Sequence, residues 1–262
     1  MAVIDIQKVS KRYLVQQSRQ LLVEDAWRKA QGKTAEFWAL RNISFQIEKS
    51  EKVAFVGSNG AGKSTLLAII SGVTHATEGV VSVRGRVAAL LALGTGLHPD
   101  LTGEENIHLI GSLMGLTRAG VRAKFNSIID FSGLHRFVEA PVRTYSTGMV
   151  GRLGFSVAVH ADADILVLDE VFAVGDSAFT KKCIEKMGEF TSQGKTVLFV
   201  SHTMETVKDV CQRAIWLQDG KILMDAGVAE VAREYEACLA SGDETATVRR
   251  DETIETQRHQ IP

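Results

Sequence analysis

The sequence lacks a surplus of charge of either sign. Of its 262 residues, 30 are Lys or Arg and 31 are Asp or Glu, which gives a net charge of −1 at pH 7 with neutral histidines. Proteins that attract nucleic acid or an anionic membrane through their overall field usually carry a basic surplus. The composition therefore gives no support for such a partner, and we expect no nucleic acid to bind.

Cysteine and long apolar runs are also scarce. Cys183, Cys211 and Cys238 form no C-x-x-C pair and no zinc spacing, a pattern typical of reduced thiols in a cytosolic protein. The longest apolar runs, such as "VAALLAL" from Val87, fall far short of the roughly 18 residues that predict a membrane span. The N-terminal "MAVIDIQKVS" lacks the basic and apolar regions of a signal peptide. We therefore expect a chain that neither crosses a membrane nor is secreted.

The apolar residues that are present predict two kinds of strand. "AVIDIQKVSKRY" from Ala2 and "RNISFQIEKSEKVAFVG" from Arg41 alternate like half-buried antiparallel strands. "ILVLDE" from Ile165 and "TVLFVSH" from Thr196 are continuous apolar runs joined by a helical stretch, as in buried parallel strands. We predict an α/β fold with a parallel-sheet core, an antiparallel β region and a helical subdomain.

The same patterns set the expected domain limits. Residues 1–240 are predicted to form one domain, with the helical subdomain at about 94–160, where the period is mostly helical. Residues 16–34 interrupt the antiparallel region, and their apolar residues, including Trp27, recur on one helix face, which predicts an inserted helix. Residues 241–262 contain few large apolar side chains and are expected to form a flexible tail.

One motif carries the strongest chemical signal. "GSNGAGKST" lies directly between the apolar runs "VAFV" and "LLAII", and its G-x-x-x-x-G-K-S spacing between a strand and a helix is that of a phosphate loop. Glycines let successive backbone amides turn toward one anion, a lysine adds a full charge, and the serine hydroxyl is a ligand for Mg²⁺. The predicted ligand is a nucleoside triphosphate. The candidate binding residues are Gly57, Ser58, Asn59, Gly60, Ala61, Gly62, Lys63, Ser64 and Thr65.

Two acids and a histidine lie at predicted strand ends. Asp169 and Glu170 close "ILVLDE", and His202 closes "TVLFVSH"; the ends of such strands are where α/β folds place their ligand sites. We assign Asp169 to Mg²⁺, Glu170 to activation of the attacking water, and His202 to the terminal phosphate. Taken without the phosphate loop, the acids could equally be solvated and the histidine structural.

A second motif, "YSTGMVGRL", begins at Tyr145. Here the chain resembles the nucleotide-binding subunits of ATP-binding cassette (ABC) transporters, whose signature reads L-S-G-G-Q. Ser146 and Gly148 match the serine and second glycine of that signature, whereas Tyr145, Thr147 and Met149 depart from it. A helix N-cap at Ser146 or Thr147 explains the same residues without any ligand.

The departures resemble one branch of that family, because "YSTGM" occurs with "LDEVFAVGD" and "LLALGTGLHPDLTGEENI". That branch exports polysaccharides and glycolipids such as O-antigen, capsule and teichoic acid. The resemblance implies ATP and Mg²⁺ as cofactors, a homodimer closed by Ser146 and Gly148, and a location on the cytoplasmic face of the inner membrane. It also implies a separate transmembrane permease that handles most of the glycan. The further implied roles are adenine stacking for Tyr13, the dimer interface for Asp176, and a route between active sites for Phe172 and Ala173. Tyr13 could equally be a core aromatic at the end of a strand.

One residue of the family pattern is missing, and several alternatives stay open. Most cassettes carry a glutamine that touches Mg²⁺, but here that place falls near Ala92 and Leu93, whose side chains cannot coordinate a metal. The alternative functions are transport of another substrate and a soluble cassette ATPase outside transport. A GTPase switch would need a guanine-reading N-K-x-D, which the sequence lacks. The inserted helix at 16–34 either packs on its own domain or contacts the membrane partner.

Overall fold

The computed structural model describes residues 1–15, 35–90, 96–169, 177–201 and 203–241. One of its two sheets has three antiparallel strands in the order β2-β1-β4. These are β1 (Ala2–Val15), β2 (Ala35–Glu48) and β4 (Glu78–Val83). Their inward-facing residues are branched and aromatic side chains, which favour a pleated surface with one buried face.

The other sheet is parallel except at one edge, where β9 runs antiparallel to β8. Its central strands are buried except at Lys52, the first residue of β3, as continuous runs of Val, Ile, Leu and Phe require. In spatial order the strands are β5 (Val87–Leu90), β6 (Ile165–Asp169), β7 (Thr196–Val200), β3 (Lys52–Val56), β8 (Arg213–Gln218) and β9 (Lys221–Gly227).

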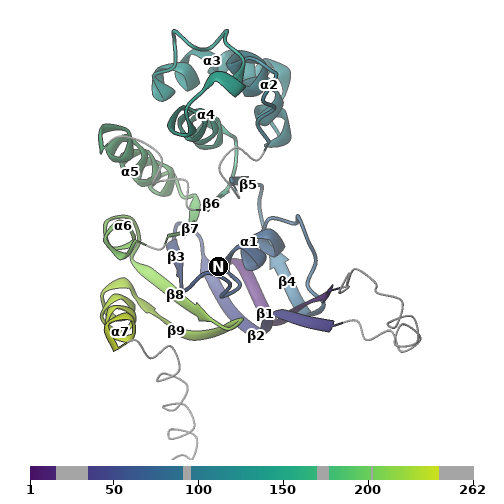
Figure 1. Cartoon of the computed structure of the whole chain (residues 1–262), viewed down its shortest axis with the longest axis vertical. Helices are drawn as coiled ribbons and strands as arrows, with labels where there is room; N and C mark the ends of the chain where they lie inside the picture. The colour runs from purple at the N-terminus through teal and green to yellow at the C-terminus, as the bar shows by residue number, and fades with distance from the viewer. Residues whose placement is uncertain (16–34, 91–95, 170–176, 202, 242–262) are drawn as a thin grey trace, which may run out of the picture.

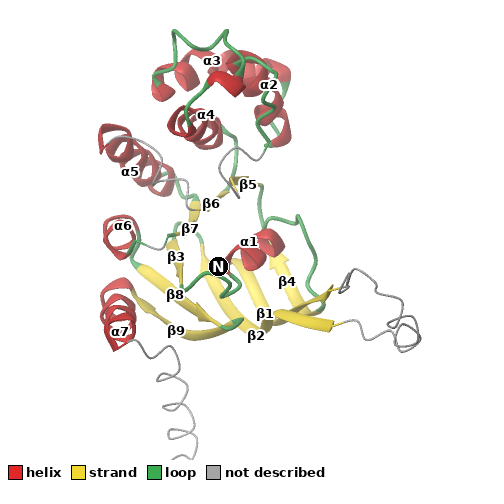
Figure 2. Cartoon of the chain, in the orientation of Figure 1, coloured by secondary structure: helices red, strands yellow, loops and turns green. Residues whose placement is uncertain are grey.

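Alternate side chains of the parallel sheet enter two different cores. Phe55 and the other side chains on its face of the sheet pack with helix α1 (Lys63–Ile70) and the antiparallel sheet. Phe199 and the other side chains on its face of the sheet pack against the helices that cover this opposite face. Figure 2 shows these helices beside the sheet. Those helices are α5 (Ser177–Ser192), α6 (Met204–Val210), α7 (Val228–Ser241) and part of α4 (Thr147–His160).

The helical subdomain has a core of its own and lies at the top of Figure 1, away from the antiparallel sheet. It consists of α2 (Gly103–Leu113), α3 (Arg118–Ser132), the 3-10 turn η3 (Val142–Thr144) and α4. Thr102 and Glu105 form a reciprocal capping box at the start of α2, which satisfies backbone donors that would otherwise lack partners. The α/β fold predicted from the sequence, with its parallel core, antiparallel region and helical subdomain, is confirmed.

The inserted helix predicted at 16–34 lies outside the described residues, as does the tail predicted at 241–262 except for Ser241, which ends α7. Within the described ranges, none of the helices combines the length and the apolarity needed to cross a bilayer.

Cys183 and Cys211 are buried free thiols. Burial raises the pKa of both thiols, that of Cys211 to about 12, so neither forms a reactive thiolate at neutral pH.

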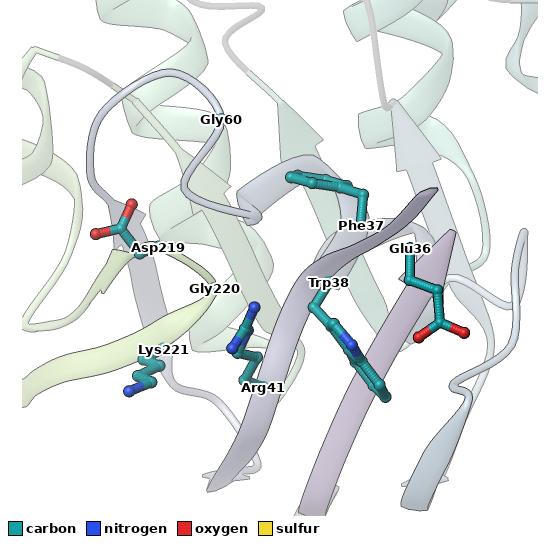
Figure 3. Close-up of a pocket in the computed structure, with 8 residues that line it drawn as sticks. All are labelled: Glu36, Phe37, Trp38, Arg41, Gly60, Asp219, Gly220 and Lys221. Atoms are coloured by element: carbon teal, nitrogen blue, oxygen red, sulfur yellow. The ribbon is translucent and has the colours of Figure 1, made fainter. Parts of the chain in front are cut away.

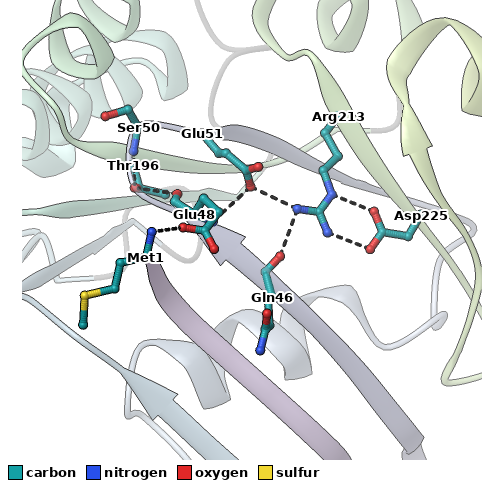
Figure 4. Close-up of polar contacts among 8 residues, drawn as sticks. All are labelled: Met1, Gln46, Glu48, Ser50, Glu51, Thr196, Arg213 and Asp225. Atoms are coloured by element: carbon teal, nitrogen blue, oxygen red, sulfur yellow. Dashed lines mark hydrogen bonds and ion pairs between the residues drawn. The ribbon is translucent and has the colours of Figure 1, made fainter.

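A charged cluster ties the two sheets together (Figure 4). The guanidinium of Arg213 on β8 binds Asp225 on β9 through two hydrogen bonds of 2.7 and 2.8 Å. It also donates to Glu51, at 3.0 Å, and to the carbonyl oxygen of Gln46 on β2, at 2.9 Å. These contacts raise the pKa of Arg213 further, because hydrogen bonds to Asp225 favour its charged form. Arg213 thus joins β8 and β9 to β2, a strand that lies far from both in the sequence.

Replacing Arg213 with lysine is expected to destabilise the fold by about 1–3 kcal/mol, because an ammonium cannot reproduce the two-pronged pairing with Asp225. Thermal and urea unfolding of the purified chain would measure the change. The matched control is Arg233→Lys, since Arg233 forms an exposed ion pair with its neighbour Glu234, and this change should leave stability within about 0.5 kcal/mol. Equal stability of both variants would show that the Arg213 cluster adds nothing to the fold.

Candidate functional site

The phosphate loop connects β3 to α1, and two of its glycines are required by close backbone contacts. Gly57 has φ +142° and Gly62 has φ +102°, a region that side-chain-bearing residues rarely adopt. A Cβ atom at Gly57 would collide with the carbonyl oxygen of Leu217, and one at Gly62 would lie 2.6 Å from that of Ala39. The loop is therefore pressed against the end of β8 and against Ala39 within β2, and these contacts hold its shape.

Lys63 is folded back over this loop. Its ammonium donates to the carbonyl oxygens of Gly57 at 2.8 Å and Ser58 at 2.9 Å, and the residue is only 6% exposed. A buried cation is costly unless charge or strong dipoles compensate it. Carbonyl oxygens compensate it in part, and a phosphate group would compensate it in full. The lysine is thus placed to bind an anion held by the loop.

The start of α1 supplies the backbone donors for the same anion. Gly62 is the N-cap and offers no side-chain hydrogen bond, while the first helical bond runs from Leu66 N to the Gly62 carbonyl. The amides at the first helical positions, Lys63, Ser64 and Thr65, precede that bond. Such amides and the helix dipole favour a negative charge. The remaining loop residues form a tight turn in which Ala61 N donates to the Ser58 carbonyl at 3.2 Å; they are Ser58, Asn59, Gly60 and Ala61.

A hydroxyl and a carboxylate meet beside this helix end. Ser64 Oγ donates to Asp169 Oδ2 at 3.1 Å, and Asp169 is buried at the end of β6. The structure thus brings together two sequence candidates that lie 105 positions apart. Both offer hard oxygen ligands, and Mg²⁺ is commonly held by one carboxylate together with a hydroxyl, water and phosphate oxygens. In the described part of the chain, no group of three or more His, Cys, Asp or Glu gathers into a metal site. The donor set therefore fits Mg²⁺ bound with a phosphate ligand.

A pocket of about 390 Å³ opens beside the tip of the phosphate loop. Phe37 on β2 contributes an aromatic face that is 53% exposed, and Asp219 contributes a carboxylate from the β8–β9 turn. In Figure 3 the rings of Phe37 and Trp38 lie on opposite sides of β2, with Phe37 on the side of the loop that carries Gly60. An aromatic face and a carboxylate next to a phosphate site suit the base and the ribose of a nucleotide. The other lining residues are Glu36, Trp38, Arg41, Gly60, Gly220 and Lys221.

Tyr13, the sequence candidate for adenine stacking, lies on β1 directly opposite Phe37 in the antiparallel pair. Both rings are exposed, and the ammonium of Lys11 lies 5.0 Å from the centre of the Tyr13 ring. Opposed residues of an antiparallel pair share one face of the sheet, so the two rings border the same surface. Sequence reasoning missed Phe37. The available signal was "FW" after the insertion, where alternation along a strand directs two aromatics to opposite faces.

The signature residues begin α4. Ser146 is the N-cap, and its Oγ accepts a hydrogen bond from Met149 N at 3.2 Å. The helix cap that the sequence predicted at Ser146 or Thr147 is therefore at Ser146. Gly148 lies in the first turn, where a missing side chain leaves the amides accessible. In Figure 1, α4 lies with the helical subdomain and well apart from α1. The signature does not meet the phosphate loop of its own chain.

Several sequence candidates lie outside the described residues and remain predictions. These are the proposed general base and phosphate-contacting histidine, the residues implied to lie at the dimer interface, and the place of the missing glutamine. They are Glu170, His202, Phe172, Ala173, Asp176, Ala92 and Leu93.

The phosphate loop, its lysine and the serine–aspartate pair at the carboxyl ends of parallel strands define a phosphate-loop nucleotide-binding protein. The helical subdomain, whose last helix begins with a signature-like motif, distinguishes one family within this class. The family model for ABC transporters matches residues 40–173, which is about half of the chain. The chain belongs to the ABC transporter family.

Relatives and solved structures agree with this assignment. The chain is 48% identical over 209 residues to the O-antigen export system ATP-binding protein RfbB of Klebsiella pneumoniae, covering 79% of this chain and 85% of that protein. It is 43% identical over 224 residues to the teichoic acids export ATP-binding protein TagH of Bacillus anthracis, covering 86% of this chain but 41% of that protein. The ATP-binding cassette MJ0796, solved as a dimer in a post-hydrolysis state with ADP and Pi, matches with a TM-score of 0.72 at 22% identity, over 86% of this chain and 98% of that one. This last likeness concerns the fold.

Truncating Phe37 to alanine is expected to weaken ATP binding by about fivefold or more, because stacking of a base on an aromatic ring contributes about 1–3 kcal/mol. Binding of inorganic tripolyphosphate should not change, because that ligand has no base. Titration calorimetry with both ligands measures the effect. The control is Leu14→Ala. It removes another exposed apolar side chain, from the residue that follows Tyr13 on β1. Equal loss of affinity for ATP and tripolyphosphate would contradict a base-binding role for Phe37.

Proposed function

We propose that this chain is the ATP-hydrolysing subunit of an ABC transporter that exports a polysaccharide or a lipid-linked glycan. The observation that supports hydrolysis is the pairing of Ser64 with Asp169 beside the buried Lys63. This arrangement offers a cation, a helix end and a Mg²⁺ ligand set to one triphosphate. The substrate class rests on the O-antigen and teichoic acid export relatives.

Each residue of the site has a proposed task in this reaction. Lys63 and the first amides of α1 bind and orient the phosphates, while Ser64 and Asp169 would hold Mg²⁺, which neutralises charge on the phosphate oxygens. Glu170 accepts a proton from the attacking water, and His202 contacts the terminal phosphate. The reaction needs no covalent intermediate, so positioning and charge stabilisation supply most of the rate.

The active form is proposed to be a homodimer. Since α4 and its signature lie apart from α1 within one chain, Ser146 and Gly148 would complete the phosphate site of a second copy. A two-fold axis satisfies both sites at once. The proposed domain spans residues 1–240, and a separate permease in the inner membrane would bind the dimer at its cytoplasmic face and handle most of the glycan.

Deletion and complementation in the source organism test this proposal. Loss of the gene should abolish the surface glycan and leave its lipid-linked precursor inside the cell, and the intact gene should restore export. A chain carrying Asp169→Asn should fail to restore it, whereas Lys208→Ala, in an exposed ion pair with Glu236, should succeed. Normal surface glycan together with lost uptake or export of another solute would assign the subunit to a different transporter. Normal transport of every substrate would favour a cassette ATPase outside transport.

A further inference from the structure

Tyr145 occupies the place where the ABC signature has leucine, and its hydroxyl makes a bond that leucine cannot make. The residue directly precedes Ser146, the N-cap of α4, and its ring packs against the helical core. Its hydroxyl donates to the carbonyl oxygen of Phe137 at 2.6 Å. A short hydrogen bond from a partly buried phenol is directional. It therefore restricts where the chain enters the signature helix.

The acceptor of this bond is itself held in place. The turn that contains Phe137 continues to Ala140, and its carbonyl oxygens cap the start of α2. Gly103 N donates to the Ala140 carbonyl at 3.2 Å, and Glu104 N donates to the Val138 carbonyl at 2.9 Å. Amides in the first turn of a helix have no partner within the helix, so these bonds attach the turn firmly to α2. Tyr145 is thereby attached to α2 through the same turn.

Gly103 makes room for this arrangement. A Cβ atom at position 103 would collide with the hydroxyl of Tyr145 and would lie 3.0 Å from the carbonyl oxygen of Val138. Because helix α2 begins at Gly103, a glycine there costs helix stability relative to alanine. The need to seat the tyrosine hydroxyl gives a physical reason for glycine at this place.

A second set of hydrogen bonds joins the residues just before Tyr145 to the loop before α2. Val142 N donates to the Leu101 carbonyl at 2.9 Å, and Arg143 N donates to the Pro99 carbonyl at 2.8 Å. The fully buried amide of Asn106 holds this loop through several backbone hydrogen bonds. Such satisfied buried networks make a loop rigid. The loop, the start of α2 and the residues that lead into α4 therefore form one connected unit.

We infer that Tyr145 is a positioning residue for the signature. Its hydroxyl sets the direction in which Ser146 and Gly148 are presented to the nucleotide on a second copy of the chain, and it makes the signature move together with α2 and loop 98–101. This inference rests on the proposed dimeric ATPase. A purely structural tyrosine would affect stability alone, whereas a positioning residue affects closure of the dimer around ATP.

The test is Tyr145→Phe in the full chain, made in the Glu170→Gln background so that hydrolysis does not reopen the dimer. The ring stays, so folding should be preserved. Binding of ATP to the monomer should match the parent, since the nucleotide site of one chain is untouched. The ATP concentration at which half the chains dimerise, measured by light scattering, should rise by about fivefold, the effect of one hydrogen bond. Tyr145→Leu, with the usual signature residue, should show at least the same shift.

Two further variants separate positioning from general loss of stability. Tyr235→Phe removes a tyrosine hydroxyl from α7 and should leave the dimerisation midpoint unchanged. Gly103→Ala should reproduce the Tyr145→Phe shift, and the double variant should show little more than either alone, because both disrupt one contact. An unchanged midpoint in Tyr145→Phe, beside a parent that dimerises with ATP, would overturn this inference alone. A parent that remained monomeric at saturating Mg-ATP would overturn the proposed dimeric function and this inference with it.

Discussion

Replacing Lys63 with alanine is expected to weaken Mg-ATP binding by about 100-fold or more, because charge-assisted hydrogen bonds to phosphate contribute about 1.5–3 kcal/mol each. The ammonium is buried over the loop carbonyls of Gly57 and Ser58, where it can reach an anion bound in the loop. ATPase activity should fall with binding. Titration calorimetry with Mg-ATP and a phosphate-release assay measure the two effects.

The control for this substitution is Lys208→Ala, which removes a lysine from an exposed ion pair on α6 and should bind ATP normally. The Lys63 variant should remain folded, because alanine leaves no charge buried at this position. Circular dichroism and thermal unfolding check this point. ATP affinity within a few-fold of the parent in a folded Lys63→Ala chain would contradict the assignment of the phosphate site.

Replacing Glu170 with glutamine is expected to reduce the rate of ATP hydrolysis by about 10²–10⁴-fold, the usual contribution of a general base. Glutamine keeps the shape of the side chain but cannot accept the proton from water. ATP binding should persist, so ATP-bound dimers should accumulate. Single-turnover hydrolysis and light scattering measure the two results in one preparation.

Asp169→Asn provides the comparison, because its carboxylate is assigned to the metal rather than to the proton. This variant should bind ATP more weakly when Mg²⁺ is present and show a raised Mg²⁺ requirement, whereas Glu170→Gln should keep the normal Mg²⁺ dependence. If Glu170→Gln turned over at nearly the parental rate, another group would have to serve as the base.

The features that sequence reasoning predicted well are local in the chain. The phosphate loop, with Lys63 and Ser64, occupies one continuous stretch, and its glycine spacing follows from backbone geometry that any such loop must satisfy. The buried strands are equally readable, because a parallel strand covered on both faces must be apolar along its length. Asp169 could be assigned from its place at the end of such a strand.

The features that sequence reasoning missed depend on pairings between distant segments. Phe37 lines the pocket beside the phosphate loop where β1 and β2 pair with several register shifts, and a slip of one residue would turn its ring to the opposite face. The contact between Tyr145 and Gly103 requires the path of the intervening turn. The bond from Arg213 to Glu51 spans 162 positions. No short sequence pattern encodes these contacts, because each depends on how distant segments pack together.

Helix α4 belongs to two cores, and this gives the molecule a lever. Phe155 and Val159 pack with the parallel sheet, whereas Leu153 and Val157 pack with α2 and α3. The end near His160 is therefore anchored at the sheet, and Ser146 lies at the far end of an arm about 21 Å long, given 1.5 Å per residue. A tilt of about 10° at the anchored end would carry the signature through about 3.6 Å on such an arm. A small rotation of the helical subdomain would therefore shift the signature by more than the length of a hydrogen bond.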